Sequence, residues 1–397
     1  MLPPIAAVKP AATEWFCEGG PPMSSSCISK LALVTCTAIL LPACAMESAG
    51  SGTARGNPIT GEGLPNPNPT VISDWGQLPD GREWGSTAGV DIDPLDGHVW
   101  AYDRCGAGSF GAGAASSCDT NLVDPILKFD RSTGEVMTSF GAGVFVTPHG
   151  LHVDSAGNVW VTDFAGNEAG TKGHQVIKFS PAGEELMRLG IAGSPGSGPG
   201  QLNQPNDVIT APDGSIFVSD GHSGQNANPP EGSTGRILKY TADGELITQW
   251  GQIGTMHGEF RTPHALAFDS GGRLYVADRG NHRIEIFDQD GNYLDSFYMF
   301  GRISGLFITE DDRLYAIDSE SSASSHPNWM NGVRIGSVDE DWVTAFIPPF
   351  PADTRPYQGA AGEGVAVDGD GNVYAAEGPN SLRWAGGGLT KYVADGM

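Results

Sequence analysis

The sequence is short of basic residues, of helical periodicity and of long apolar runs. Its 397 residues include 22 Lys and Arg against 47 Asp and Glu, which gives a formal net charge of −25 at pH 7. A surface of that sign repels phosphate backbones, so nucleic acid is not an expected partner. The lack of helical patterning, together with 57 glycines and 28 prolines, indicates a protein of short strands and many turns.

The longest apolar run, Leu31 to Leu41, is too short to span a membrane as a permanent helix. A short basic region ending at Lys30 precedes this run, and Leu41-Pro42-Ala43-Cys44 ends it in a way that is similar to a bacterial lipoprotein box. We therefore expect residues 1–44 to be an export leader ending at an acylated Cys44, with an ordinary cleaved signal peptide as the alternative. The expected location is the periplasm or the outer membrane, with membrane contact only through the lipid anchor.

Cysteine is scarce outside this leader. Of the six cysteines, only Cys105 and Cys118 lie beyond residue 44. In an oxidising compartment such a pair predicts a disulfide, which would close the loop of residues 106–117; a pair of metal-binding thiolates is the alternative. Residues 45–70 are rich in Gly, Pro and Asn without an apolar period, so we expect a flexible tether before a domain of residues 71–397.

What the sequence does contain is a repeated unit of strand, tight turn and strand. The six copies are residues 89–93 with 99–103, 150–154 with 159–163, 207–210 with 216–220, 262–268 with 274–278, 305–308 with 314–318, and 364–368 with 373–377. Six such repeats predict a closed ring of small antiparallel sheets, an all-β six-bladed β-propeller.

An outer-strand pattern follows five of the six repeats but not the last one. A matching stretch, residues 70–76, stands instead before the first repeat. The simplest arrangement is that this N-terminal strand completes the last blade, which leaves no free sheet edge between the chain ends. We expect a monomer.

The loops at one face of such a ring bring chemistry-bearing residues together. The residues just before each inner strand are Ala88, His149, Asn206, His264, Ser304 and Glu363. His149, His264 and Glu363 come from alternate blades, so we expect them to form a tripod for zinc or another divalent cation. For each histidine taken singly, a hydrogen bond to a neighbouring loop is the alternative.

The residues just after each second strand should reach the same mouth. They include Arg104 and Arg279, which we expect to face each other and to capture a carboxylate. An ion pair with a nearby acid is the alternative. The Asp or Glu that ends the second strand in all six copies is predicted to be a structural loop cap.

The residues now support a family resemblance. Residues 278–287 are similar to an NHL repeat, and residues 147–151, 206–208, 217–221, 262–267 and 277–279 together resemble the peptidyl-α-hydroxyglycine α-amidating lyases, over roughly residues 71–397. The resemblance implies a six-bladed propeller with zinc held by three histidines, a structural calcium, and a tyrosine and arginines at the mouth. It also implies cleavage of a peptidyl hydroxyglycine into a peptide amide and glyoxylate.

Three positions depart from the family pattern. Glu363 stands at the third zinc histidine, Gly364 at the acid that binds calcium, and His222 at the tyrosine. Calcium therefore lacks its side-chain ligand, and His222 could be a general base, a further metal ligand or a residue without a role.

The expected function is a metal-dependent carbon–nitrogen lyase that acts on a small carboxylate or a peptide C-terminus and releases glyoxylate or a similar acid. A non-catalytic NHL-type binding propeller and a lactonase-like metal-dependent hydrolase are the alternatives.

Overall fold

The computed structural model describes residues 55–79, 81–106, 117–351, 359, 361–378 and 387–395. The expected leader with Cys44 lies outside these residues, as does most of the loop between Cys105 and Cys118. Among the described residues, no helix is both long enough and apolar enough to cross a bilayer.

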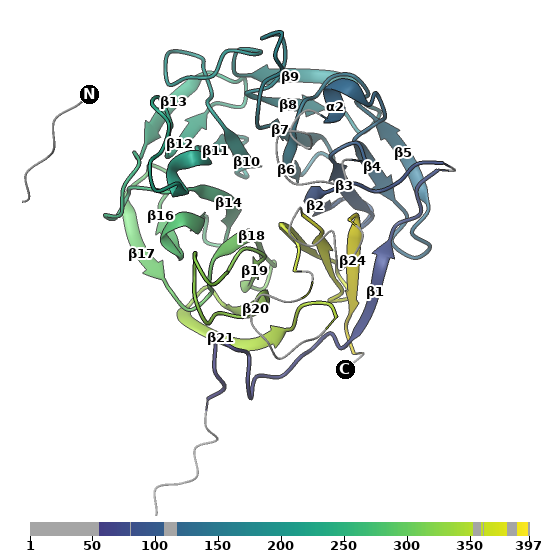
Figure 1. Cartoon of the computed structure of the whole chain (residues 1–397), viewed down its shortest axis with the longest axis vertical. Coiled ribbons are helices and arrows are strands. Elements are labelled where there is room, and N and C mark those ends of the chain that lie inside the picture. Colours follow the sequence, from purple (N-terminus) through teal and green to yellow (C-terminus); the bar gives the residue numbers. More distant parts are fainter. Residues whose placement is uncertain are drawn as a thin grey trace, which may run out of the picture. The chain divides into compact units, whose positions relative to one another are not determined.

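Six four-stranded antiparallel sheets surround a central axis, which confirms the predicted β-propeller (Figure 1). Blade 1 consists of β2 (Thr87–Ile92), β3 (Val99–Asp103), β4 (Ile126–Phe129) and β5 (Val136–Phe140). Blade 2 consists of β6 (Pro148–Val153), β7 (Val159–Asp163), β8 (Gln175–Phe179) and β9 (Glu185–Leu189). Blade 3 consists of β10 (Pro205–Thr210), β11 (Ile216–Asp220), β12 (Arg236–Tyr240) and β13 (Leu246–Trp250).

The remaining blades follow the same order from the axis outward. Blade 4 consists of β14 (Pro263–Phe268), β15 (Leu274–Asp278), β16 (Arg283–Phe287) and β17 (Tyr293–Phe297). Blade 5 consists of β18 (Ile303–Ile308), β19 (Arg313–Asp318), β20 (Gly332–Ser337) and β21 (Glu340–Ile347). Blade 6 consists of β22 (Gly364–Val367), β23 (Val373–Ala376), β24 (Leu389–Val393) and β1 (Thr70–Trp75). In the part of the chain that the structure describes, three short helical turns lie in loops: α2 (Ser117–Thr120), η1 (Ser223–Gln225) and η2 (Arg279–Asn281).

The turn between the two inner strands of a blade is built by an aspartate. In blade 2 the Asp154 carboxylate accepts hydrogen bonds from the backbone N–H groups of Ala156 and Asn158, and Gly157 takes a φ of 81°. Such a turn needs a residue that tolerates positive φ, which glycine does without a steric penalty. Asp368 and Asn372 repeat the same hydrogen bond in blade 6.

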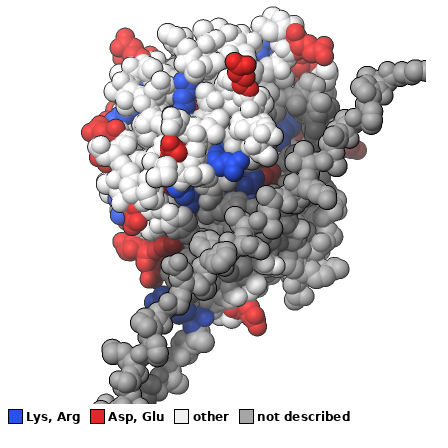
Figure 2. Space-filling view, turned by 60° about the vertical axis from the view of Figure 1, so that its left-hand side comes forward, with Lys and Arg blue, Asp and Glu red and all other residues white. Residues whose placement is uncertain are grey.

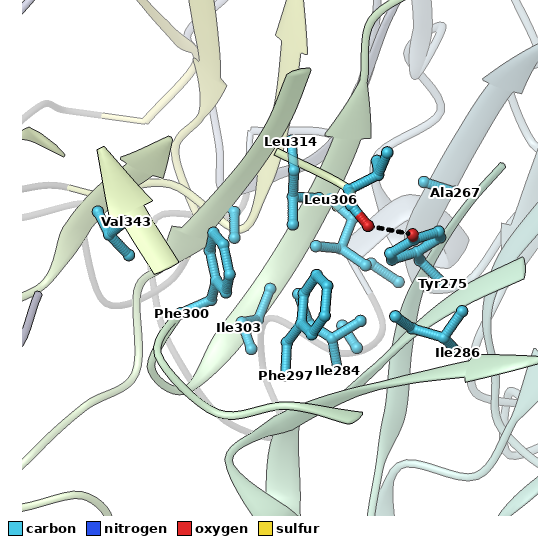
Figure 3. Packing of buried hydrophobic residues seen from close by; sticks show 14 residues of the cluster. Ala267, Tyr275, Ile284, Ile286, Phe297, Phe300, Ile303, Leu306, Leu314 and Val343 are labelled. Atoms are coloured by element: carbon cyan, nitrogen blue, oxygen red, sulfur yellow. Dashed lines mark hydrogen bonds between the residues drawn. The ribbon is translucent and has the colours of Figure 1, made fainter. Parts of the chain in front are cut away.

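The core lies between neighbouring blades, where apolar side chains of adjacent sheets interdigitate. Between blades 4 and 5 the rings of Phe297 and Phe300 stack, and the Tyr275 hydroxyl donates to the carbonyl of Val338 at 3.1 Å (Figure 3). Each blade thus lacks a complete core of its own, and the ring must close for all the sheets to be buried.

Closure is made as predicted, by the N-terminal strand. Strand β1 pairs antiparallel with β24, with Thr70 opposite Val393. The Trp75 ring at its end packs against Tyr374 and Phe129 at centroid distances of 4.9 and 5.9 Å. The first described strand and the last therefore lie in one sheet.

The stretch just before β1 differs from the expected tether. The carbonyls of Ile59 and Pro65 accept hydrogen bonds from the backbone of blade 5, and the Asn68 amide donates to the carbonyl of Tyr392 in blade 6. The fully buried Arg334 also donates to the carbonyls of Pro58 and Ile59. Residues 57–69 are part of the propeller because they form these hydrogen bonds with blades 5 and 6. Since most of these bonds use backbone carbonyl groups, the role produces no repeating apolar pattern in the sequence.

Two further predictions are confirmed in the loops. Cys105 and Cys118 form a disulfide with an S–S distance of 2.01 Å. The acids that end the second strands cap the preceding loops: Asp163, for example, accepts from the backbone N–H groups of Val146 and Thr147. Burial raises the pKa of Asp163 to about 7. The capping acids are Asp103, Asp163, Asp220, Asp278, Asp318 and Glu377.

Charged side chains are dispersed on the outside of the molecule. On the coloured part of the face in Figure 2, acidic and basic groups are scattered among uncharged residues, and some lie next to each other.

The closing strand provides a test of the ring. Replacing Trp75 by Ala removes a 7% exposed ring from the contacts with Phe129 and Tyr374, and we expect a loss of about 3–5 kcal/mol in the free energy of unfolding. Ile72→Ala, on the same strand but 44% exposed, should change it by no more than about 0.5 kcal/mol. Urea unfolding measures both, and equal losses would contradict a closing role for β1.

Candidate functional site

One mouth of the central channel is lined by the residues that precede the inner strands. The lining of a cavity of about 50 Å³ includes the whole predicted ring of six positions. These positions are Ala88, His149, Asn206, His264, Ser304 and Glu363. Residues far apart in the sequence thus meet at one place because every blade presents the same loop to it.

A β-bulge aims these side chains. In blade 4 the pairing register passes from Pro263 to Ala265 and omits His264. In blade 2 it passes from Pro148 to Leu151 and omits His149 together with Gly150. The proline at the start of each strand has no N–H to contribute to a ladder. A bulge turns the unpaired residue away from the regular alternation, so both imidazoles point into the channel. Blades 1, 3 and 5 shift register at the same place.

Both histidines are fixed in one tautomer. Nδ1 of His149 lies 2.8 Å from the carbonyl oxygen of Asn206, and Nδ1 of His264 lies 2.6 Å from that of Ser304. Because a carbonyl oxygen only accepts, Nδ1 carries the proton in each ring and Nε2 keeps its lone pair. Both Nε2 atoms are buried and have no hydrogen-bond partner among the described residues. This is the arrangement in which histidine binds a metal.

His222 supplies the third imidazole. It follows Gly221, whose φ of 139° turns the chain out of β11, and it precedes η1. Its ring centroid lies 5.7 Å from that of His149 and 5.5 Å from that of His264. One ring nitrogen from each of the three lies within 4.8 Å of the others.

The electrostatics keep these imidazoles neutral. Burial, followed by the positive charge of Arg104, lowers the pKa of His149 to about 3. Burial and then Arg279 hold the pKa values of His222 and His264 well below the usual range. Three neutral imidazoles with two orphaned Nε2 atoms fit a divalent cation such as zinc, which takes nitrogen ligands in threes or fours.

Glu363 is placed differently from its expected role as the third ligand. Its carboxylate reaches the same mouth, but its oxygens lie 3.4 Å from Nη2 of Arg104 and 3.6 Å from Nη1 of Arg279. The cluster that brings ligand atoms together contains His222 instead. The ring position of Glu363 follows from the repeat, whereas the direction of its side chain is decided by the two guanidinium groups beside it.

The two predicted arginines do meet at the mouth. Arg104 is held by hydrogen bonds from its Nε to the carbonyl of Pro148, at 2.9 Å, and from its Nη1 to Ser86. Arg279 is fully buried and donates from Nη2 to Nε2 of His222 at 2.9 Å. The Nε and Nη1 groups of Arg279 have no hydrogen-bond partner among the residues that the structure describes.

The Arg279 hydrogen bond constrains what His222 can do. An arginine only donates, so Nε2 of His222 accepts and its lone pair is in use. To act as a base or as a ligand through Nε2, His222 must exchange Arg279 for another partner. The interpretations of His222 as base and as metal ligand therefore share one condition, the movement of the Arg279 guanidinium.

Sequence reasoning missed two residues of the mouth. Arg302 lies just before β18 and donates from Nη1 to the carbonyl of Arg279, while its Nη2 lies 3.3 Å from Glu320. Glu320 also approaches Nη1 of Arg279 at 3.6 Å. Arg302 stands two residues before the predicted ring position Ser304, and Glu320 stands two residues after Asp318, which ends β19. A wider window at each repeat boundary would have included both.

Comparison with known proteins agrees with this architecture. Residues 260–287 match the NHL repeat family model. The chain is 31% identical over 328 residues to peptidyl-glycine alpha-amidating monooxygenase B of Xenopus laevis, covering 76% of this chain and 34% of that protein. It is 32% identical over 283 residues to peptidyl-alpha-hydroxyglycine alpha-amidating lyase 1 of Drosophila melanogaster, covering 64% of this chain and 46% of that protein.

A solved structure extends the comparison to the fold alone. The gluconolactonase XC5397 of Xanthomonas campestris superposes with a TM-score of 0.50 at 15% identity, over 82% of this chain and 89% of that one. The chain spans less than half the length of the two curated relatives named above. The sequence relatives, the NHL repeat and the six blades agree, and the chain belongs, as a divergent member, to the peptidyl-α-hydroxyglycine α-amidating lyase family of NHL-repeat β-propellers.

Proposed function

We propose that this protein is a metal-dependent lyase that cleaves the carbon–nitrogen bond of an α-hydroxylated amide bearing a carboxylate, and that it releases glyoxylate or a similar small acid. The observation that carries the proposal is the juxtaposition of three neutral histidines with two buried arginines at one mouth. The names of the relatives, which include an α-hydroxyglycine amidating lyase, support the choice of substrate class.

His149 and His264 would hold the ion through their unpartnered Nε2 atoms, with the base His222 beside them, and we propose that the ion is zinc. When bound, such an ion supplies a Lewis acid that lowers the pKa of a hydroxyl group. Arg104 and Arg279 bind and orient the substrate carboxylate, because guanidinium groups match the two carboxylate oxygens in geometry as well as in charge. Their burial excludes competing water and strengthens the contact.

The reaction needs one proton to leave the hydroxyl oxygen and one to reach the departing amide nitrogen. The C–N electron pair goes to nitrogen as the C–O bond becomes a carbonyl, so the products are an amide and an aldehyde acid. His222 is the group placed to carry this proton: its neutral Nε2 becomes available when Arg279 transfers its Nη2 donor from His222 to the substrate. Substrate binding and activation of the base are then one event.

The site's location in the cell belongs to the same proposal. The disulfide is consistent with an oxidising compartment, and we propose that the chain is exported and anchored through Cys44. Replacing Cys44 by Ser should move the protein from the membrane fraction to the soluble fraction, detected by fractionation and immunoblotting. An unchanged distribution, with an unlipidated Cys44 in mass spectrometry of the wild-type protein, would leave only the cleaved signal peptide.

The metal is tested by direct analysis. Purified protein should carry about one zinc per chain after dialysis, and His149→Ala and His264→Ala should each lose most of it, as measured by inductively coupled plasma mass spectrometry. His257→Ala is the matched control, because His257 is half exposed and pairs with Glu285 away from the cluster. Equal metal content in all four proteins would reject the assignment of the histidines.

The reaction is tested with a peptide that ends in α-hydroxyglycine and with glyoxylate as the measured product. Chelation should abolish turnover and zinc should restore it. Arg104→Gln should lower kcat/KM about 10- to 100-fold, as expected for loss of a hydrogen bond to a charged group. Arg131→Gln, in a surface pair with Asp370, should have little effect.

Absence of glyoxylate from metal-loaded wild-type protein would reject the lyase. Hydrolysis of a lactone under the same conditions would then favour the hydrolase, and protein without bound metal would favour a binding propeller.

A further inference from the structure

Glu363 is held in the mouth by its own backbone and by the glycines around it. It is 7% exposed, and its N–H donates to the carbonyl of Ala376 at 2.6 Å. Gly378 leaves the space that the side chain fills, since a Cβ at that position would lie 2.9 Å from Cγ of Glu363. The side chain therefore has room beside Gly378, and its carboxylate lies in the gap between Arg104 and Arg279.

The contacts that Glu363 makes there are incomplete. Its oxygens approach Nη2 of Arg104 at 3.4 Å and Nη1 of Arg279 at 3.6 Å, whereas a charge-assisted hydrogen bond of good geometry measures about 2.7–2.9 Å. Arg279 is 0% exposed, and its Nε and Nη1 groups find no hydrogen-bond acceptor in the described part of the chain. Buried N–H donors without acceptors are unfavourable, and one of them, Nη1, faces the carboxylate of Glu363.

We propose that Glu363 is a resident carboxylate that occupies the substrate-carboxylate position, and that ligands bind by displacing it. A free carboxylate can bring one oxygen to Nη1 of Arg279 and the other to Nη2 of Arg104 at hydrogen-bonding distance, which Glu363 does not reach because its backbone fixes one end. The proposal rests on the proposed function only for the identity of the natural ligand; the competition itself requires no turnover.

The charge of the mouth agrees with displacement by an anion. Three guanidinium groups, those of Arg104, Arg279 and Arg302, face the two carboxylates of Glu320 and Glu363. Among the described residues of the mouth, these guanidinium groups outnumber the carboxylates even when Glu363 is in place, so an incoming anion is attracted before Glu363 leaves.

The neighbours of the gap define the class of ligand. His149, His264 and Glu363 line the same small cavity, so a carboxylate at the arginines places its α-carbon substituent beside the imidazoles. A small 2-hydroxy or 2-oxo carboxylate fits this pattern. Glu363 then sets specificity, because only a ligand whose carboxylate binds the arginines better than the Glu363 carboxylate can enter.

The test measures binding of glycolate to the purified full-length protein by isothermal titration calorimetry, with a chelator present so that metal and turnover play no part. Glu363→Ala should bind glycolate at least about tenfold more tightly than the wild type, a change of about 1.4 kcal/mol. Glu363→Gln, which keeps the size and removes the charge, should also bind more tightly. Thermal melting verifies that each variant is folded, and Glu363→Gln decides the matter if Glu363→Ala is not.

Glu320→Gln is the matched control. It removes one negative charge from the same mouth, where Glu320 pairs with Arg279 and Arg302, but it does not vacate the gap between Arg104 and Arg279. Its gain should stay below about threefold, which is under 1 kcal/mol. An unchanged or weaker affinity in both Glu363 variants, or an equal gain in Glu320→Gln, would overturn the proposal. Tighter glycolate binding without lyase activity would retain this proposal and reject the proposed reaction.

Discussion

The site depends on hydrogen bonds that pass from each blade to the next around the mouth. Nδ1 of His149 in blade 2 donates to the carbonyl of Asn206 in blade 3, and the Asn206 amide donates to the carbonyl of Pro263 in blade 4. His264 continues the chain to Ser304 in blade 5. Because each bond joins a side chain to the backbone of the following blade, the imidazoles keep their positions only while the blades keep their register.

This dependence couples ring closure to chemistry. Blade 6 reaches blade 1 through the Glu363–Arg104 pair, and Arg104 reaches blade 2 through the carbonyl of Pro148. Strand β1 completes blade 6 as its outermost strand, so three strands of the sheet separate it from the channel. Its pairing nevertheless holds the last blade against the first, so the outer edge of the ring supports the geometry at the axis.

Features of the fold and the site that follow from a local sequence pattern could be predicted from the sequence alone. The repeats predicted six blades, the unmatched outer strand predicted closure, and the ring positions of His149 and His264 followed from their place before each inner strand. Side-chain direction was not predictable in this way: Glu363 turns to arginines supplied by blades 1 and 4. Residues 57–69 were missed for a related reason, since their role is to offer backbone carbonyls, which every sequence can do.

The arginines also explain why a chain so acidic keeps an acid in its anion site. A buried guanidinium group without a counter-charge is strongly destabilising, and Arg279 is fully buried. Glu363 and Glu320 supply that counter-charge when no ligand is present, at the expense of affinity for the ligand. A residue of this kind stabilises the free protein and weakens the complex, which is the usual conflict between stability and function at a binding site. The acid at position 363 thus has a physical consequence whichever reaction the site performs.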